Sequence, residues 1–277
     1  MADSPAFWKQ AENDLTLGID TTVPASARVW NYWLGGKDHY PADRQAGEAF
    51  ARLYPGMAGL ARSCRYFTAR LVRFLAAEAG IRQFLDIGCG LPFQDNTHEI
   101  AAAAAPGCRV VYADSDPLVV TFARALLTAS PPASTGHLHA DLNDPAALLD
   151  MARASLDFTR PVAVLLMQVL GHIGDPRDGD HAALAAVSQI KDALPSGSYL
   201  TISEITDTEP ALNAALSAYH QEGAGRYHAR RPDQIARFFE GLELISPGVV
   251  PIGQWRPDPS PFTAPATPVL GAAGAKT

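Results

Sequence analysis

The sequence predicts an α/β fold with a doubly wound, mostly parallel sheet. After residue 80, short apolar stretches alternate with stretches of helical periodicity, which is the pattern of strands joined by crossover helices. Residues 162–167 are apolar at every position, as expected for a strand buried on both faces of a parallel sheet. A further apolar strand breaks into Gly88-Cys89-Gly90. A glycine turn between a strand and a helix is half of a nucleotide-binding βαβ unit.

The chain is expected to divide into an N-terminal arm with a helical cap, residues 1–80, and a Rossmann-like domain, residues 81–277. Residues 1 to about 20 show little periodicity. The predicted cap helices span residue 25 to about 38, residues 41–53, and a longer helix that ends at Gly80. Apolar residues at i, i+3, i+4 spacing define the long helix: Leu60, Cys64, Phe67, Leu71, Phe74 and Leu75. Arginines largely off this stripe predict a solvated face: Arg62, Arg65, Arg70 and Arg73.

The first predicted helix carries Trp30 and Trp33 and is broken by a glycine pair at residues 35–36. Two interpretations stay open. The tryptophans can pin the arm onto the main domain as buried side chains. Alternatively, Asn31, Tyr32 and their neighbours form a lid over a bound cofactor or acceptor.

The elements of the sheet domain follow in order. The predicted strands are 84–87, 109–113 followed by Asp114, a strand that ends at Asp141, 162–167, 199–204, 242–246 and 269–275. The predicted helices are a helix that opens at Asn96, with Glu99 three residues on, and the segments 117–127, 182–194, 208–221 and 232–240. The proline-rich stretch 247–268 is expected to be a connector.

The glycine turn selects the class of cofactor. A dinucleotide fingerprint needs a third glycine so that the helix can aim its N-terminus at a pyrophosphate, but this position is Phe93, after Pro92. No Gly-Lys-Ser/Thr follows, which excludes a Walker phosphate loop. S-adenosylmethionine fits better, because it carries adenosine without phosphate. Asp114 lies roughly 20 residues or a little more beyond the turn, where an acid can hold a ribose diol, and Asp86 is close to the expected amino-acid end.

Three segments resemble the first motifs of class I S-adenosylmethionine-dependent methyltransferases: residues 86–90, 112–117 and 139–142. Residues 24–38, 84–96 and 242–257 together resemble an actinobacterial family of predicted methyltransferases of unknown function. The resemblance implies a class I sheet whose last strand runs antiparallel between the fifth and sixth strands. Pro92 departs from the general motif, which often has a third glycine.

The resemblance also implies roles for single residues. Gly88 and Gly90 approach the methionine end of the cofactor, Asp114 the ribose hydroxyls, and Asp141 with Leu142 the adenine. The full set of candidate cofactor-binding residues is Asn31, Asp86, Gly88, Gly90, Asp114, Ser115, Asp141, Leu142 and Gln168.

Candidate catalytic residues follow the fourth and fifth strands, because ligands of open α/β sheets bind at the carboxyl ends of strands. His172 and Glu204 are the candidate general bases for a hydroxyl or protonated amine acceptor. Alternatively, His172 only caps a loop and Glu204 only holds a helix N-terminus or an arginine. Cys89 has no His or Asn partner in its sequence context and is interpreted as a small loop residue.

Composition narrows the class of protein. The net charge of −7 over 277 residues disfavours nonspecific nucleic-acid binding. The cysteines, Cys64, Cys89 and Cys108, form neither a disulfide framework nor a metal spacing. The first residues do not form a signal peptide, and the apolar run 161–170 is too short for a membrane span. The sequence therefore predicts a cytoplasmic protein that binds neither membrane nor nucleic acid.

The predicted function is S-adenosylmethionine-dependent methyl transfer to a small-molecule acceptor. The alternative is a non-catalytic protein that senses S-adenosylmethionine or S-adenosylhomocysteine, because the sequence contains no identifiable acceptor motif. An NAD-dependent oxidoreductase is disfavoured by Phe93.

Overall fold

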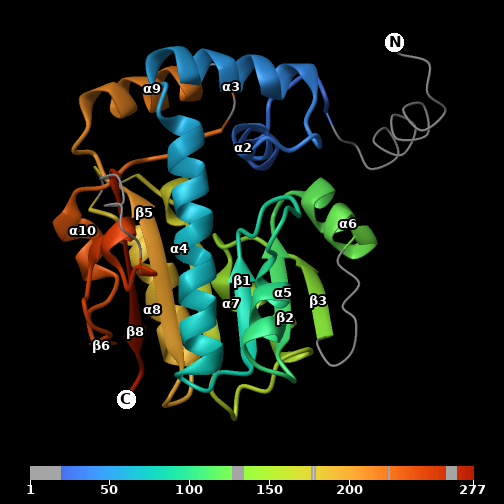
Figure 1. The fold of residues 1–277 in the computed structure, drawn as a ribbon, viewed down its shortest axis with the longest axis vertical. Helices are drawn as coiled ribbons and strands as arrows, with labels where there is room; N and C mark the ends of the chain where they lie inside the picture. The colour runs from blue at the N-terminus through green and yellow to red at the C-terminus, as the bar shows by residue number, and fades with distance from the viewer. Residues whose placement is uncertain are drawn as a thin grey trace.

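A sheet of eight strands forms the centre of the described part of the protein (Figure 1). The structure, a computed structural model, describes residues 20–126, 134–175, 177, 179–221, 223, 225–259 and 267–277. The strands run in the order β3-β2-β1-β4-β5-β8-β6, and β7 pairs with β8 outside this path. They span β1 Gln83–Ile87, β2 Arg109–Asp114, β3 Ser134–His139, β4 Ala163–Met167, β5 Tyr199–Ile205, β6 Glu243–Leu244, β7 Val250–Pro251 and β8 Val269–Ala275.

The sheet is mostly parallel. Strands β3, β2, β1, β4 and β5 pair in parallel, whereas β8 pairs antiparallel with β5, β6 and β7. The predicted doubly wound sheet, with an antiparallel last strand between the fifth and sixth, is confirmed, and β8 has the predicted bounds. Strand β7 lies in the stretch that we expected to be a plain connector. Residues 260–266 of that stretch lie outside the described residues.

Helices cover both faces of the sheet (Figure 1). Because successive strand residues point to opposite faces, Phe84 and Leu165 pack beneath α4 and α5, whereas Leu85 and Val164 pack beneath α7 and α8. The helices are α2 Ser26–Leu34, α3 Pro41–Leu53, α4 Met57–Ala77, α5 Thr97–Ala104, α6 Pro117–Leu126, α7 Pro145–Arg153, α8 His181–Ala193, α9 Pro210–Gln221 and α10 Pro232–Arg237, with 3₁₀ turns η1 Leu170–His172 and η3 Ile252–Gln254. Of these described helices, none is long and apolar enough to cross a bilayer.

The N-terminal helices sit on one face and one end of the sheet. The apolar stripe of α4 is buried against the sheet, as predicted, at Leu60, Cys64, Phe67, Leu71 and Leu75. Helices α3 and α9 lie across the end of the molecule above α4 (Figure 1), where the rings of Phe50 and Tyr219 meet with centroids 5.8 Å apart. The cap therefore joins elements from both ends of the chain.

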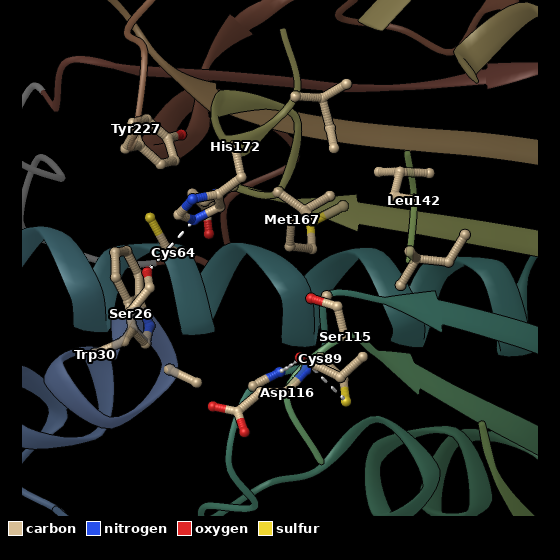
Figure 2. A pocket seen from close by; sticks show the side chains of 18 of the residues that line it. Ser26, Trp30, Cys64, Cys89, Ser115, Asp116, Leu142, Met167, His172 and Tyr227 are labelled. Carbon is tan, nitrogen blue, oxygen red and sulfur yellow. Dashed lines mark hydrogen bonds between the residues drawn. The ribbon is translucent and has the colours of Figure 1, made fainter. Parts of the chain in front are cut away.

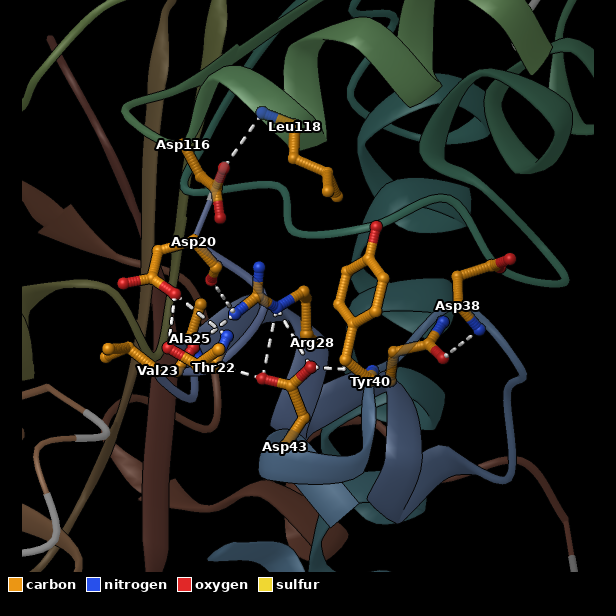
Figure 3. A network of polar contacts seen from close by, with 11 residues as sticks. Asp20, Thr22, Val23, Ala25, Arg28, Asp38, Tyr40, Asp43, Asp116 and Leu118 are labelled. Carbon is orange, nitrogen blue, oxygen red and sulfur yellow. Dashed lines mark hydrogen bonds and ion pairs between the residues drawn. The ribbon is translucent and has the colours of Figure 1, made fainter. Parts of the chain in front are cut away.

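Helix α2 is fixed to α3 by a buried polar network (Figure 3). The guanidinium of Arg28 donates from Nε to Asp43 at 3.0 Å and from Nη2 to the Val23 carbonyl at 2.5 Å. The Asp43 carboxylate also accepts the backbone N–H groups of Ala25 and Tyr40, at 2.9 and 2.8 Å. One carboxylate thus ties the start of α2 to the start of α3.

Two details of the sheet domain differ from the prediction. Helix α7 was not predicted, although Asp144 caps it by accepting the N–H of Ala147 at 3.1 Å and Pro145 occupies its first turn. Strand β3 ends at His139 rather than at Asp141. The Asp141 carboxylate instead accepts the N–H of Asn143 at 2.8 Å, a local side-chain bond that favours a turn over a strand.

Candidate active site

A cavity of about 460 Å³ opens at the carboxyl ends of β1, β2, β4 and β5 (Figure 2). Its floor consists of the ends of these strands and the segments that follow them, together with the segment after β3, and its other walls come from α2, α3, α4 and α9. This volume is within the range of small-molecule sites, about 300–1,000 Å³. The position agrees with the expectation that ligands of an open α/β sheet bind outside the strand ends.

The glycine turn lines one end of this cavity. Gly88 and Gly90 have φ values of 70° and 66°, which glycine adopts without steric cost. A Cβ at Gly88 would collide with the side chain of Val169, whereas a Cβ at Gly90 would meet no atom within 4 Å. The first glycine therefore permits close packing of the fold, and the second borders open space in the cavity.

The loop after the turn displaces the helix that follows. Residues 91–96 separate Gly90 from the start of α5 at Thr97, and no residue of α5 is among the described cavity-lining residues. Within the loop, Asn96 accepts the N–H of Phe93 at 3.1 Å and donates its own N–H to Glu99 at 2.7 Å. The helix N-terminus that would bind a pyrophosphate is thus absent from this part of the cavity.

Arg65 also lines this end of the cavity, although sequence reasoning placed it on a solvated face. Its Nη2 donates to the carbonyls of Gln94 and Asp95, both at 2.8 Å. Its Nε and Nη1 make no hydrogen bond to any other described residue. Arg62 is exposed, as predicted. Helical periodicity identifies the side of α4 that carries these arginines but not the loop that packs against it, so the sequence held no signal that singles out Arg65.

Two acids flank the glycine turn: Asp86 is buried and Asp114 is half-buried. Asp114 accepts the N–H groups of Gly90 and Asp116, each at 3.0 Å. Burial raises the pKa of Asp114 to about 6, against the lowering effect of these two bonds. Asp86 accepts the hydroxyl of Thr97 at 2.6 Å, and burial raises its pKa as well. Each acid keeps lone pairs for a ligand donor.

The remaining predicted cofactor residues on strand ends also line the cavity: Ser115, Asp141, Leu142 and Gln168. Gln168 directly follows β4 with φ of 53°, a left-handed conformation that is uncommon for a residue with a Cβ. Its Nε2 donates to the hydroxyl of Ser203, which leaves its Oε1 without a partner among the described residues. The hydrogen bond to Ser203 helps to hold Gln168 in this uncommon backbone conformation. Residues held in this way are concentrated at functional sites.

Asn31 does not line the cavity in the described structure. Its Oδ1 accepts the N–H of Asp38 at 3.1 Å, and its side chain occupies the space that a Cβ at Gly36 would need. Its carbonyl accepts the Gly36 N–H at 2.9 Å. Asn31 therefore shapes the connection between α2 and α3, while its neighbours Trp30 and Trp33 reach the cavity.

His172 lines the other end of the cavity and faces α2 (Figure 2). Its Nδ1 lies 2.6 Å from the carbonyl of Arg226. A carbonyl can only accept, so Nδ1 carries the proton and Nε2 is the acceptor of the neutral ring. Nε2 lies 3.4 Å from the hydroxyl of Ser26. Desolvation in the cleft lowers the pKa of His172, which favours the neutral form.

Glu204 is fully buried beneath this end of the cavity and does not line it in the described structure. Its carboxylate accepts the N–H of Leu170 at 2.8 Å and the hydroxyl of Tyr227 at 2.7 Å. Burial raises its pKa to about 7. The Tyr227 ring lies between Glu204 and the cavity and meets the His172 ring edge to face at 5.1 Å. Glu204 thus contacts the site only through Tyr227 and η1.

Aromatic rings surround the part of the cavity beneath the cap. Trp33 meets Trp30 at 5.8 Å and Phe50 at 4.8 Å between ring centroids, and Tyr219 lies 6.0 Å from Trp33. The Trp33 indole N–H donates to the carbonyl of Gly47 at 3.2 Å. Trp33 is only 8% exposed, so it both anchors the arm and lines the cavity.

Cys89, between the two glycines, is not suited to nucleophilic attack. Burial and the nearby Asp114 carboxylate raise the pKa of its thiol well above the usual range. A protonated thiol is a poor nucleophile. The interpretation of Cys89 as a small loop residue is consistent with this environment.

The sheet order, the antiparallel last strand and the cavity beside a Gly-x-Gly turn define a class I S-adenosylmethionine-dependent methyltransferase fold. The chain belongs to the S-adenosyl methyltransferase family, whose model matches residues 12–276. No curated protein matches the chain significantly.

Solved structures agree with this assignment. A DUF574 family protein from Streptomyces avermitilis is 40% identical, with a TM-score of 0.86 over 93% of this chain and 99% of its own. A Thermobifida fusca protein, proposed to be a methyltransferase, is 38% identical, with a TM-score of 0.84 over 94% of this chain and 97% of its own. The predicted actinobacterial methyltransferase family is thereby confirmed. The mitomycin 7-O-methyltransferase MmcR shares the fold, at 19% identity and a TM-score of 0.50 over 99% of this chain and 69% of its own.

Proposed function

We propose that this methyltransferase acts on a small-molecule acceptor held beneath α2, in the cavity that also holds the cofactor. The observation that carries the proposal is the continuity of this cavity. It extends from Gly90 and Asp114 at the strand ends to Trp30 and His172 beneath the cap. Both reactants can therefore meet in one shared cavity, where proximity and orientation contribute most of the acceleration.

The end of the cavity near the glycine turn suits S-adenosylmethionine. Gly90 offers open space for the approach of a ligand, and Asp114 can accept hydrogen bonds from a ribose diol. Arg65 and Asp86, one cationic and one anionic, lie beside the turn and would hold the carboxylate and ammonium of an amino-acid end. Asp141 and Leu142 would contact the adenine. When bound, S-adenosylmethionine supplies an electrophilic methyl group.

The other predicted cofactor residues take different roles in this proposal. Ser115 and Gln168 lie on the cavity wall and would contact the cofactor directly. Asn31 would act indirectly, because it shapes the α2–α3 connection and so positions Trp30. We retain the proposed division into a cap of residues 1–80 and a cofactor-binding domain of residues 81–277.

Helix α2 would act as the lid. Ser26, Ala27, Trp30 and Trp33 of this helix line the cavity, and Ala27 also packs on the cluster of Leu91, Leu118 and Val119 beside the glycine turn. A cover that contacts both the cap and the cofactor loop excludes water from the reaction.

His172 would be the general base. Its neutral form presents Nε2 to the cavity, and the carbonyl of Arg226 holds the ring in this tautomer. A positioned base contributes about 10² to 10⁴-fold. Glu204 would be a positioning residue, because Tyr227 separates it from the cavity.

The experiment measures cofactor binding and turnover separately. Calorimetry with S-adenosylhomocysteine tests the cofactor site. Methyl transfer from methyl-labelled S-adenosylmethionine to components of a small-molecule extract tests catalysis, with His172→Asn as the loss-of-base variant and His220→Asn, on the exposed side of α9, as its control. We expect binding by all three proteins, turnover by the parent and the control, and a loss of about 10² to 10⁴-fold for His172→Asn. Binding without turnover by the parent would favour the sensor alternative.

Hydrogen exchange along α2 tests separately whether this helix acts as a lid. We expect S-adenosylhomocysteine to slow amide exchange in residues 26–34 when the lid contacts the cofactor site. Equal exchange in the presence and absence of saturating ligand would leave α2 as a packing element only.

A further inference from the structure

We propose that the acceptor is a neutral aromatic hydroxyl compound of one or two fused rings, oriented by Trp30 and deprotonated at its hydroxyl by His172. This inference rests on the proposed function and names the substrate class of the same site. It follows from three independent observations: the shape of the acceptor space, its lack of charge, and the hydroxyl that already faces His172.

The walls of the acceptor space suit a flat, apolar ring. Trp30 from α2, Phe50 from α3 and Tyr219 from α9 enclose this space together with Met57 and Leu216. Aromatic side chains bind other rings through stacked or edge-to-face contacts, which add to the stabilisation from burial of the ring surface. Trp30 is half-buried, and its indole makes no hydrogen bond to a described residue, so its ring is available to a ligand. Since the cofactor takes part of a cavity of about 460 Å³, the acceptor must be small.

In the described part of the cavity wall, fixed charges line only the cofactor end. Among the described lining residues, the carboxylates are Asp86, Asp114, Asp116 and Asp141, and the fixed cation is Arg65. All five lie near the glycine turn: Asp86 at the end of β1, Asp114 and Asp116 at and after the end of β2, Asp141 after β3, and Arg65 beside the loop at residues 94–95. Among the described residues that line the acceptor space beneath α2, none carries a fixed charge that could pair with an ammonium or a carboxylate, and burial of an unpaired charge is costly. A neutral acceptor is therefore favoured.

The contact between Ser26 and His172 indicates a hydroxyl. The Ser26 hydroxyl lies 3.4 Å from Nε2, which is longer than the upper end of the usual range for protein hydrogen bonds, about 3.2 Å. Nε2 faces the Ser26 hydroxyl at the cavity wall (Figure 2), and this long contact leaves Nε2 able to accept a shorter hydrogen bond from a ligand. An acceptor hydroxyl at a normal distance would replace this long contact.

The pKa of His172 limits which acceptor hydroxyls it can deprotonate. A neutral imidazole transfers a proton best from a group whose pKa is not far above its own. Desolvation lowers the pKa of His172, so an aromatic hydroxyl, with a pKa near that of tyrosine at about 10, suits it far better than an aliphatic alcohol. A neutral aromatic amine already has a free electron pair and would not need His172 before attack.

The hydroxyl oxygen forms a bond to the methyl carbon while the bond from that carbon to the cofactor sulfur breaks, and the sulfur keeps the electron pair. The hydroxyl proton passes to Nε2 of His172. The products are an aryl methyl ether and S-adenosylhomocysteine, and the imidazolium releases its proton to solvent when the cavity opens.

The test uses one ring with four different functional groups. The parent protein is incubated with labelled S-adenosylmethionine and with 2-naphthol, 2-naphthylamine, 2-naphthalenemethanol or 2-naphthoic acid. Binding of each compound to the S-adenosylhomocysteine complex is followed by quenching of intrinsic fluorescence. We expect 2-naphthol to bind and to be methylated at least about tenfold faster than the other three.

Variants separate the proposed role of Trp30 in binding the aromatic ring from that of His172 in removing the hydroxyl proton. Trp30→Ala is expected to raise the KM for 2-naphthol roughly tenfold, whereas Tyr66→Ala, a 64%-exposed aromatic on α4 outside the cavity, leaves it unchanged. For His172→Asn we expect kcat to fall and quenching by 2-naphthol to persist.

Two results would overturn the proposal. The first is faster methylation of the amine, the benzylic alcohol or the acid. The second is a protein that binds S-adenosylhomocysteine but neither binds nor methylates 2-naphthol. Both leave the cofactor assignment standing, whereas failure to bind S-adenosylhomocysteine would overturn the proposed function itself.

Discussion

Arg28 and Asp43 form an ion pair inside the cap, with side chains only 3% and 0% exposed and Nε 2.9 Å from Oδ2. Removal of one partner leaves an uncompensated buried charge, which costs about 3–5 kcal/mol. We expect Asp43→Ala to lower the free energy of unfolding by this amount in urea titrations. Asp38→Ala, which changes an exposed carboxylate in the α2–α3 connection, is the control. Equal effects of the two variants would contradict a structural role for the pair.

Arg65 is expected to bind the carboxylate at the amino-acid end of the cofactor. Arg65→Gln removes the charge, and a hydrogen bond to a charged group contributes about 1.5–3 kcal/mol, so the affinity for S-adenosylhomocysteine should fall roughly 10- to 150-fold in calorimetry. The affinity for 5′-methylthioadenosine, which lacks the amino-acid carboxylate, should change little. Arg62→Gln is the matched control on the exposed side of α4. Parallel losses for both ligands would show that Arg65 acts only through the loop at residues 94–95.

Asp114 is expected to hold the ribose diol. Asp114→Ala should weaken S-adenosylhomocysteine binding by about 1.5–3 kcal/mol, because charge-assisted hydrogen bonds are lost. Asp116 makes a different contact, since its carboxylate accepts the N–H of Leu118 at the start of α6, at 2.8 Å. A larger loss of affinity for Asp116→Ala than for Asp114→Ala would move the ribose contact to Asp116.

Cofactor affinity should also depend on pH through Asp114. The carboxylate accepts ribose hydroxyls in its ionised form, and its pKa in the free protein is about 6. Affinity should therefore be constant above this pH and should fall by up to tenfold per unit as pH drops below it. Calorimetry from pH 5 to pH 8 measures this slope, and the Asp114→Asn variant should lose it. An unchanged slope in the variant would assign the titration to another group.

Ionisation of Glu204 should make the fold less stable as pH rises from about 4.5 to about 7. Burial raises its pKa from 4.5 to about 7 in the folded state, with Arg230 opposing the shift. The folded state therefore binds the Glu204 proton more tightly than the unfolded state does. The contribution of Glu204 to the free energy of unfolding is greatest below pH 4.5 and falls by about 2–4 kcal/mol as pH rises to about 7. Glu204→Gln resembles the protonated form and should stabilise the protein at pH 8 but not at pH 4.5. Equal urea midpoints for parent and variant at pH 8 would contradict this expectation.

The sequence predicted elements well where local chemistry defines their ends. Helix α3 has the predicted bounds, with Pro41 in its first turn and the Tyr40 N–H bound by Asp43. Strand β8 also has its predicted bounds. Helix α7 carries the same kind of local signal, an N-cap at Asp144 and a proline at residue 145 in its first turn.

The site was harder to predict, because its residues meet through tertiary contacts. Sequence order places Glu204 at a strand end beside the cavity, but Tyr227, from a loop more than twenty residues later, covers it. Periodicity places Arg65 on the polar side of its helix, yet the loop carbonyls at residues 94–95 fold onto that side. Asn31 lies one residue from Trp30, and one step along a helix turns a side chain by about 100°.

The loop of residues 91–96 between Gly90 and α5 should reduce competition from ATP. ATP carries the same adenosine as the cofactor and is abundant in cells. A helix N-terminus placed at the turn would attract its triphosphate, but residues 91–96 move α5 away from the cavity. The carboxylates of Asp86, Asp114 and Asp116 would also repel a polyanion there. The protein should therefore select a zwitterionic sulfur nucleoside from a large excess of nucleoside phosphates without any additional gate.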